Sequence, residues 1–230
     1  DAANLCSLAK EHGVLSIVDA VTSLGGIPVE VDRWGADAVY SATQKCLSCP
    51  PGISPLTISK EAEKKIKNRS APVQSWFMDL NLVMGYWDDS GGRTYHHTAP
   101  VNAMYGLHEA LIMLLEEGLE EAWSRHTVMH KALWAGLSAL GLERHVPEAH
   151  ALPQLNTVKV PDEIDESAVR AALLEDYNIE IGAGLGELAG TVWRIGLMGE
   201  TARPTSVRRI LSALEKVLQT EGKVEVKRSP

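Results

Sequence analysis

Two short apolar segments near the start of the chain each end in polar residues, and this arrangement constrains the fold more than any other feature. Residues 14–18 are predicted to form a buried strand closed by Asp19, and residues 36–40 a second strand that ends before a polar turn with Lys45. A helix precedes the first strand and stops at Gly13. This order is typical of an open α/β sheet, which binds ligands outside the carboxyl ends of its strands. We therefore expect Asp19 and Lys45 at such ends.

The second half of the chain has a different pattern. Residues 100–140 are helical almost throughout, with a break at Gly118. The elements expected elsewhere are strands at 56–58, 155–160, 179–181 and 192–195 and helices at 166–177 and 204–220. The pattern after the long helical connector predicts a small α+β domain.

Composition argues against two classes of partner. The chain has 22 Lys and Arg against 30 Asp and Glu, a net charge of -8, without a basic stripe that could hold nucleic acid. Apolar stretches such as residues 110–115 fall well short of the roughly 20 residues that a membrane span needs. Three cysteines are too few for a disulfide framework and favour a reducing compartment: cytoplasm, peroxisome or mitochondrion. Because the chain opens at Asp1 without a Met, we expect a fragment, and the compartment stays unknown.

Four segments resemble successive motifs of the class V, fold type I, pyridoxal-phosphate (PLP) aminotransferases. They are SIVDAVTSLGG at 16–26, YSATQKCLSCPPG at 40–52, YHHTAP at 95–100 and WRIGLMG at 193–199. Within that class they are most similar to alanine–glyoxylate and serine–pyruvate aminotransferases. The resemblance makes residues 1–118 the C-terminal part of a large mixed-sheet, PLP-binding domain and residues 119–230 a small C-terminal domain. The first half of the family's large domain, with its glycine-rich phosphate loop and ring-stacking aromatic residue, is absent from this sequence.

Lys45 is the catalytic residue that the resemblance implies. A PLP enzyme needs an amine that holds the cofactor as a Schiff base and shuttles a proton, whereas an ordinary lysine is a solvated surface residue. Asp19 is implied to keep the pyridinium nitrogen of the cofactor protonated. The alternative for Asp19 is a helix or turn cap. Val21 is implied to pack on one face of the ring, and the alternative is an ordinary core valine.

Four further residues receive roles from the resemblance. Gln44 would donate to the PLP phosphate, whereas the desulfurases and lyases of this fold typically have a His before the lysine. Tyr95 and Thr98 would reach across a dimer interface to the phosphate of the neighbouring subunit. Arg194, expected at the end of a strand, would clamp the substrate α-carboxylate with its guanidinium group, with a surface salt bridge as the alternative.

Three patterns suggest other chemistry and are weaker. Cys46 and Cys49 form a C-x-x-C pair, but no second pair accompanies it for zinc and no thioredoxin-like helix follows it. His96 and His97 are adjacent on an extended segment and are expected to point to opposite sides, so no metal site is predicted. Residues 184–189 match a loose nucleotide-binding pattern, yet a strand rather than a helix is expected to follow.

The sequence therefore predicts a homodimeric PLP enzyme with a composite active site. Its expected reaction is transamination of small α-amino acids, with alanine or serine as donor and glyoxylate or pyruvate as acceptor. Two alternatives stay open: a PLP-dependent lyase or cysteine desulfurase of the same fold, and an inactive fragment. The fragment alternative arises because a sheet without its missing segment would keep unpaired edges and lack most phosphate donors.

Overall fold

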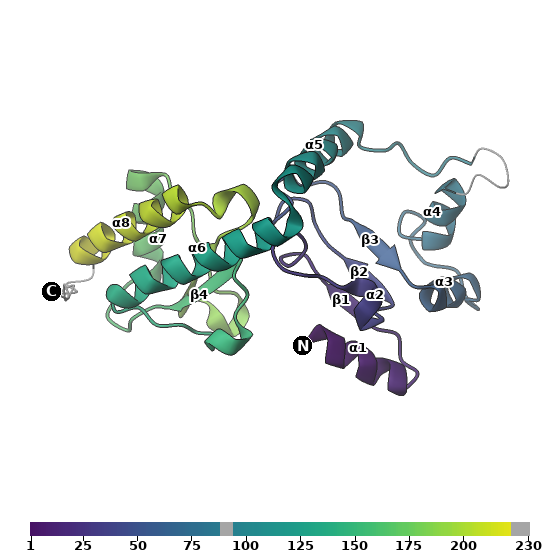
Figure 1. The fold of residues 1–230 in the computed structure, drawn as a ribbon, viewed down its shortest axis with the longest axis horizontal. Helices are drawn as coiled ribbons and strands as arrows, with labels where there is room; N and C mark the ends of the chain where they lie inside the picture. The colour runs from purple at the N-terminus through teal and green to yellow at the C-terminus, as the bar shows by residue number, and fades with distance from the viewer. Residues whose placement is uncertain (88–93, 222–230) are drawn as a thin grey trace.

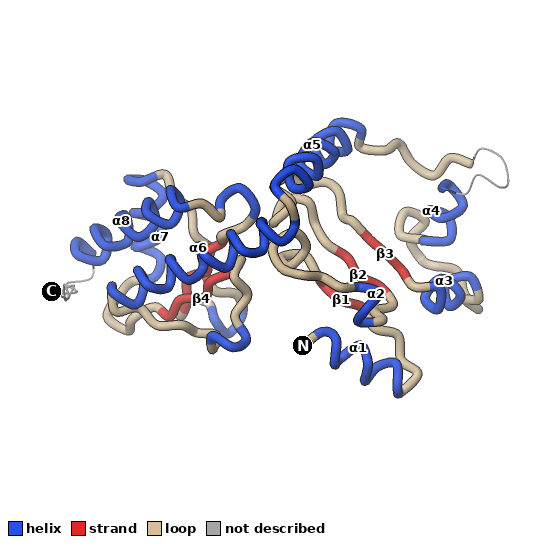
Figure 2. The backbone as a smooth tube through the Cα atoms, in the orientation of Figure 1, coloured by secondary structure: helices blue, strands red, loops and turns tan. Residues whose placement is uncertain are grey.

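The computed structural model describes residues 1–87 and 94–221 and contains two three-stranded sheets with helices packed around each (Figure 1). The sheets occupy opposite halves of the molecule, and helices α5 (Val101–Glu117) and α6 (Leu119–Ala139) meet between them (Figure 2). None of the helices in the described ranges combines the length and the apolar character needed to cross a bilayer. The arrangement confirms the predicted α/β architecture.

The first sheet is mixed and positions the predicted strand-end residues. Its strands, in spatial order, are β1 (Ile17–Asp19), β2 (Ala38–Tyr40) and β3 (Leu56–Ile58). β1 and β2 are parallel, with Asp19 opposite Tyr40, and β3 is antiparallel to β2. Helices α1 (Ala2–Glu11) and α2 (Val31–Trp34) contact each other beside this sheet. A small core that includes Cys6 and Val39 joins these elements.

Four helices lead from the first sheet to the second. They are α3 (Lys60–Lys67), α4 (Leu80–Trp87), α5 (Val101–Glu117) and α6 (Leu119–Ala139). Gly118 separates α5 from α6 with φ 91°, a value that glycine adopts readily, so the predicted break is confirmed. The sequence analysis did not predict α3 or α4. Ser59 caps α3 by accepting a hydrogen bond from the Ala62 amide at 3.0 Å.

The second sheet is antiparallel, in the order β4 (Leu155–Lys159), β6 (Val192–Gly196), β5 (Gly182–Ala183). Helix α8 packs against both α6 and α7. The remaining elements here are α7 (Glu166–Tyr177), α8 (Pro204–Glu221) and the 3-10 turns η1 (Glu148–His150), η2 (Gly186–Leu188) and η3 (Gly199–Thr201). The core of this half is extensive and includes the fully buried Leu133, Leu137, Trp193 and Leu214.

Two predicted strands require correction. β1 begins at Ile17 rather than at residue 14 and includes Asp19 as its last residue. The strand predicted at 179–181 is wrong, because pairing with β6 begins only at Gly182. The apolar spacing of 179–181 reflects packing after α7, since the Ile179 amide donates to Leu173 O at 3.0 Å and Ile181 is buried.

Candidate active site

The carboxyl ends of β1 and β2 lie at one edge of the first sheet. The chain segments that leave the two strands are joined there by hydrogen bonds. The Ala20 amide donates to Tyr40 O at 2.8 Å, and the Ser41 hydroxyl donates to Ala20 O at 2.9 Å. Asp19 therefore ends one strand at the edge where the segment leading to Lys45 leaves the other, as the sequence predicts.

Asp19 uses its two carboxylate oxygens differently. Oδ1 accepts the amide hydrogen of Val21 at 2.8 Å, which is the local turn cap that the sequence left open as the alternative. Oδ2 accepts the phenolic hydrogen of Tyr40 at 2.8 Å. Each oxygen of an ionised carboxylate has two lone pairs, so the exposed Asp19 can accept further donors from a ligand.

Tyr40 is a neighbour of the site that the sequence analysis missed. Its hydrogen bond to the Asp19 carboxylate raises the pKa of the Tyr40 hydroxyl, because loss of the phenolic proton would break that bond and place two negative charges together. The available signal was positional. Residues at the ends of two adjacent parallel strands lie opposite each other, and Tyr40 ends the second predicted strand.

Lys45 lies in a turn that hydrogen bonds of Thr43 stabilise. The Thr43 hydroxyl donates to Pro50 O at 2.8 Å, and the Cys49 amide donates to Thr43 O at 3.1 Å. Thr43 is buried, Lys45 is half-buried and Gln44 is exposed. In the part of the chain that the structure describes, no hydrogen bond or ion pair engages the Lys45 ammonium group. A half-buried amine without a partner is available to bind a ligand.

Arg194 is the third residue of the five-residue strand β6, not the end of a strand as predicted. Its Nε donates to Ala183 O at 2.6 Å, which fixes the base of the guanidinium group. Gly182 lies beside it, and a Cβ there would be 3.3 Å from Arg194 Nη2, so the glycine leaves room for the side chain. Among the described residues, none bonds to the two terminal nitrogens, which remain able to bind a carboxylate as a fork.

Tyr95 and Thr98 lie next to each other. Their hydroxyls hydrogen-bond each other, and both side chains are exposed on the connection between α4 and α5 (Figure 1). Within the described residues, this chain makes no hydrogen bond between either hydroxyl and Lys45. The structure therefore brings the two hydroxyls to each other but not to the lysine of the same chain.

The predicted orientation of His96 and His97 is wrong. Their Nδ1 atoms are 2.7 Å apart, because the segment is not a regular strand and the two rings meet edge to face. His96 also stacks on Trp76, with ring centroids 4.0 Å apart. Across residues 1–87 and 94–221, no three His, Cys, Asp or Glu side chains gather as metal ligands.

The cysteine pair near Lys45 consists of free, buried thiols. The Cys46 thiol donates to Thr22 O at 3.3 Å, and burial raises its pKa to about 11. Residues 184–189 form the short turn η2 and lead into β6, so the helix that a nucleotide-binding pattern requires does not follow.

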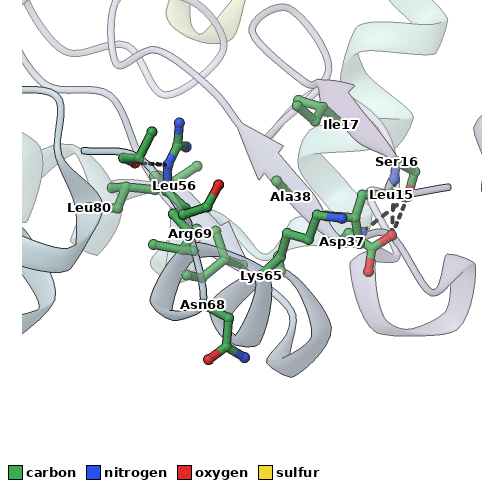
Figure 3. Close-up of a pocket in the computed structure, with 15 residues that line it drawn as sticks. Leu15, Ser16, Ile17, Asp37, Ala38, Leu56, Lys65, Asn68, Arg69 and Leu80 are labelled. Carbon is green, nitrogen blue, oxygen red and sulfur yellow. Dashed lines mark hydrogen bonds between the residues drawn. The ribbon is translucent and has the colours of Figure 1, made fainter. Parts of the chain in front are cut away.

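The pocket drawn in Figure 3 belongs to a different part of the first sheet. It has a volume of about 930 Å³ and lies at the amino ends of β1 and β2, against α3. Its lining is largely apolar and includes the exposed side chains of Leu15, Ile17 and Leu56. Asp19 and Lys45 are not among its lining residues, so this pocket is not the candidate site.

The donor set at the carboxyl edge fits PLP. An aldehyde cofactor with a ring nitrogen needs a partner-free amine and an accessible carboxylate, and Lys45 and Asp19 supply both at one edge of a mixed sheet. The mixed first sheet and the antiparallel second sheet, each with its helices, have the fold type I architecture of PLP-dependent aminotransferases.

The sequence model of the family "Aminotransferase class-V" matches residues 1–199. The chain belongs to this family, whose members are PLP-dependent enzymes.

Named relatives share this family. Alanine–glyoxylate aminotransferase of Callithrix jacchus is 41% identical over 214 residues, covering 92% of this chain and 52% of the relative. (S)-Ureidoglycine–glyoxylate transaminase of Bacillus subtilis is 37% identical over 227 residues, covering 91% of this chain and 54% of the relative. The crystal structure of alanine–glyoxylate aminotransferase from Nostoc sp. superposes with a TM-score of 0.90 at 48% identity, covering 93% of this chain and 56% of that one. The chain therefore spans about half the length of the curated relatives it matches.

Proposed function

We propose that the protein of which this chain is part is a PLP-dependent transaminase of small α-amino acids. One observation carries the proposal: in a class-V aminotransferase chain, an accessible aspartate and the segment of Lys45 come to the same carboxyl edge of two parallel strands. Among the described residues, none forms a hydrogen bond or ion pair with the Lys45 amine. Lys45 is the amine that binds the cofactor covalently and moves a proton between the substrate Cα and the cofactor. When bound, PLP supplies an electron sink for that carbon.

The residues around Lys45 have separate proposed roles. Asp19 keeps the ring nitrogen protonated, because a carboxylate within hydrogen-bond reach favours the charged form of its partner. Tyr40 holds that carboxylate in place through its hydroxyl. Val21 packs on one ring face, and the exposed Gln44 amide donates to the cofactor phosphate.

Arg194 is the proposed site for the substrate carboxylate. Its Nε donates to Ala183 O, and no residue in the described part of the chain bonds to Nη1 or Nη2, so these two nitrogens can bind one carboxylate. A second carboxylate in the substrate side chain would need its own cationic partner, since burying it unpaired costs on the order of several kcal/mol. We therefore propose alanine or serine as the donor and glyoxylate or pyruvate as the acceptor. Glyoxylate is part of the names of all three relatives described above, whereas the donor in those names is alanine in two and (S)-ureidoglycine in the third.

We also propose a homodimer in which Tyr95 and Thr98 serve the cofactor of the neighbouring subunit, with residues 1–118 and 119–230 as the two domains. Support comes from exposed apolar side chains that precede α4 or lie near the start of α5, on either side of the connection that carries these hydroxyls, and that a second copy would cover. They are Trp76, Phe77, Met78, Met104 and Tyr105.

The test is chemical labelling of the full-length protein loaded with PLP. Borohydride reduction followed by peptide mapping should place the pyridoxyl group on Lys45, and the matched Lys45→Arg variant should take up no label. The same preparation should transfer the amino group of alanine or serine to glyoxylate or pyruvate. A label on another lysine, or release of sulfide with formation of alanine from cysteine, would overturn the proposal.

A further inference from the structure

The loop that follows Lys45 is in direct contact with the turn that follows Arg194. The Glu200 amide in η3 donates to Ser48 Oγ at 2.9 Å, although the two residues are 152 positions apart in the sequence. Ser48 lies three residues after Lys45, and Gly199, the first residue of η3, lies five residues after Arg194. The contact therefore links the proposed cofactor lysine to the proposed carboxylate-binding arginine by short stretches of chain.

Backbone conformation shows how close this contact is. Ser48 has φ 58° and Gly199 has φ 55°, both in the left-handed region. A Cβ at position 199 would overlap Ser48 Oγ and lie 2.9 Å from Cys46 O, so the surrounding atoms would have to shift to admit one. A serine held in this unfavourable conformation needs surrounding structure to maintain it. Strained residues of this kind cluster at functional sites.

His126 holds the turn from the other side. This side chain on α6 is only 1% exposed, and its Nε2 accepts the Gly199 amide hydrogen at 2.9 Å. Its Nδ1 lies 2.6 Å from Ala122 O, which can only accept. Because the amide can only donate and the carbonyl can only accept, the ring is neutral with its proton on Nδ1. Burial lowers the pKa of His126, which keeps this neutral form.

Arg125 fixes the carbonyl side of the same turn. Its Nη1 donates to Gly199 O at 2.7 Å and to Ala202 O at 3.2 Å. Its Nη2 donates to Glu117 Oε2 at 2.6 Å, so an ion pair with α5 orients the guanidinium group. The backbone N–H and C=O groups of Gly199 are thus bound by two adjacent residues of α6, His126 and Arg125.

We propose that His126 is a positioning residue of the active site: by accepting the Gly199 amide hydrogen, it holds η3 against the loop of Lys45. The inference rests on the proposed roles of Lys45 and Arg194. It assigns His126 no contact with substrate or cofactor. Its function is to keep the distance between the lysine and the arginine fixed, and misplacement of reacting groups by about 1 Å can cost a hundredfold in rate.

Two substitutions at position 126 test the hydrogen-bond acceptor separately from the rest of the side chain. Gln places an amide oxygen near the position of Nε2 and can accept the Gly199 hydrogen, whereas the shorter Asn reaches only the position of Nδ1. His130 is a matched control on the same helix. It is also buried, but it binds the Asn156 side chain in the second half of the molecule, at 2.7 Å, rather than η3.

The first measurement is amide hydrogen exchange in the full-length protein. His126→Asn leaves a buried N–H unpaired, so exchange of the Gly199 and Glu200 amides should accelerate about ten- to a hundredfold. His126→Gln should stay within about threefold of wild type, and so should His130→Gln at these two amides. If His126→Asn does not fold, Ser48→Gly tests the same contact from the lysine side and should accelerate exchange at Glu200. Unchanged exchange at these amides in the variant that folds would overturn the proposal.

The second measurement is the steady-state reaction. His126→Asn should lower kcat/KM about ten- to a hundredfold, with recovery in His126→Gln and no comparable loss in His130→Gln. Equal losses in His126→Asn and His126→Gln would overturn the proposal, because only the acceptor distinguishes them. Labelling of a lysine other than Lys45 would instead refute the proposed function. The hydrogen-exchange result does not depend on that labelling, so failure of the His126 proposal can be distinguished from failure of the proposed function.

Discussion

Replacing Gly199 by alanine should destabilise the protein strongly. An alanine at φ 55° costs about 1–2 kcal/mol in backbone strain. The new Cβ would overlap Ser48 Oγ, so the loops must separate. Overpacking of this kind costs about 1–3 kcal/mol. The Glu200–Ser48 hydrogen bond, broken by the same movement, contributes about 1 kcal/mol. We expect a total loss of about 3–6 kcal/mol in the free energy of unfolding.

Three further variants isolate the clash. Gly186 has a similar φ of 57° but nothing within 4 Å of a built Cβ, so Gly186→Ala should cost only the backbone contribution of about 1–2 kcal/mol. Ser48→Gly removes the overlapping oxygen and the unfavourable conformation of Ser48 while losing one hydrogen bond, so its net effect should be small. In the double variant Gly199→Ala, Ser48→Gly, about 1–3 kcal/mol of the loss should return.

Urea denaturation of the full-length protein, followed by far-UV circular dichroism, measures all four free energies. The reasoning fails if Gly199→Ala costs no more than Gly186→Ala, because the clash would then be absent. It also fails if the double variant is no more stable than Gly199→Ala alone. Either result would mean that η3 and the loop of Lys45 do not touch.

Three further predictions concern the reaction. Asp19→Asn should leave PLP bound but slow the chemical step by several orders of magnitude in single-turnover experiments, because a neutral amide cannot hold the ring proton; a nearly unchanged rate would remove Asp19 from the site. Arg194→Lys should lower kcat/KM for alanine and serine alike, by an amount that corresponds to about 1.5–3 kcal/mol of lost transition-state stabilisation, since an ammonium group cannot form the two-pronged contact. If aspartate or glutamate were a better donor than alanine and serine, the site would contain a second cationic group. Mixing a Lys45→Ala chain with a Tyr95→Phe, Thr98→Ala chain should restore one active site per heterodimer, and heterodimers without activity would place the two hydroxyls in cis.

The carboxyl-edge site could be predicted because its signals are local. Asp19 and the segment of Lys45 each follow an apolar run, and parallel strands bring their ends to one edge without any further information. Helix α3 was not predicted, since it is almost entirely charged and its short apolar face has a single buried residue, Ala62.

The contacts that surround the site could not be predicted, because they join distant residues without a periodic signal. The Gly199 amide meets His126 across 73 positions, and Tyr40 meets Asp19 across 21. A histidine in the middle of a helical pattern looks the same whether it packs in a core or accepts a backbone hydrogen bond. The strand predicted at 179–181 failed for a related reason, since apolar alternation does not distinguish pairing from burial after a helix.

The buried thiol next to Lys45 bears on chemical selectivity. A thiolate beside an aldehyde cofactor would be a rival nucleophile, and it would also be the form that peroxide oxidises. With a pKa of about 11, only about one Cys46 side chain in ten thousand is ionised at pH 7. The hydrogen bond of its thiol to Thr22 O further directs the sulfur towards the backbone. In its proposed role, the amine of Lys45 would therefore meet the cofactor without competition from the Cys46 thiol.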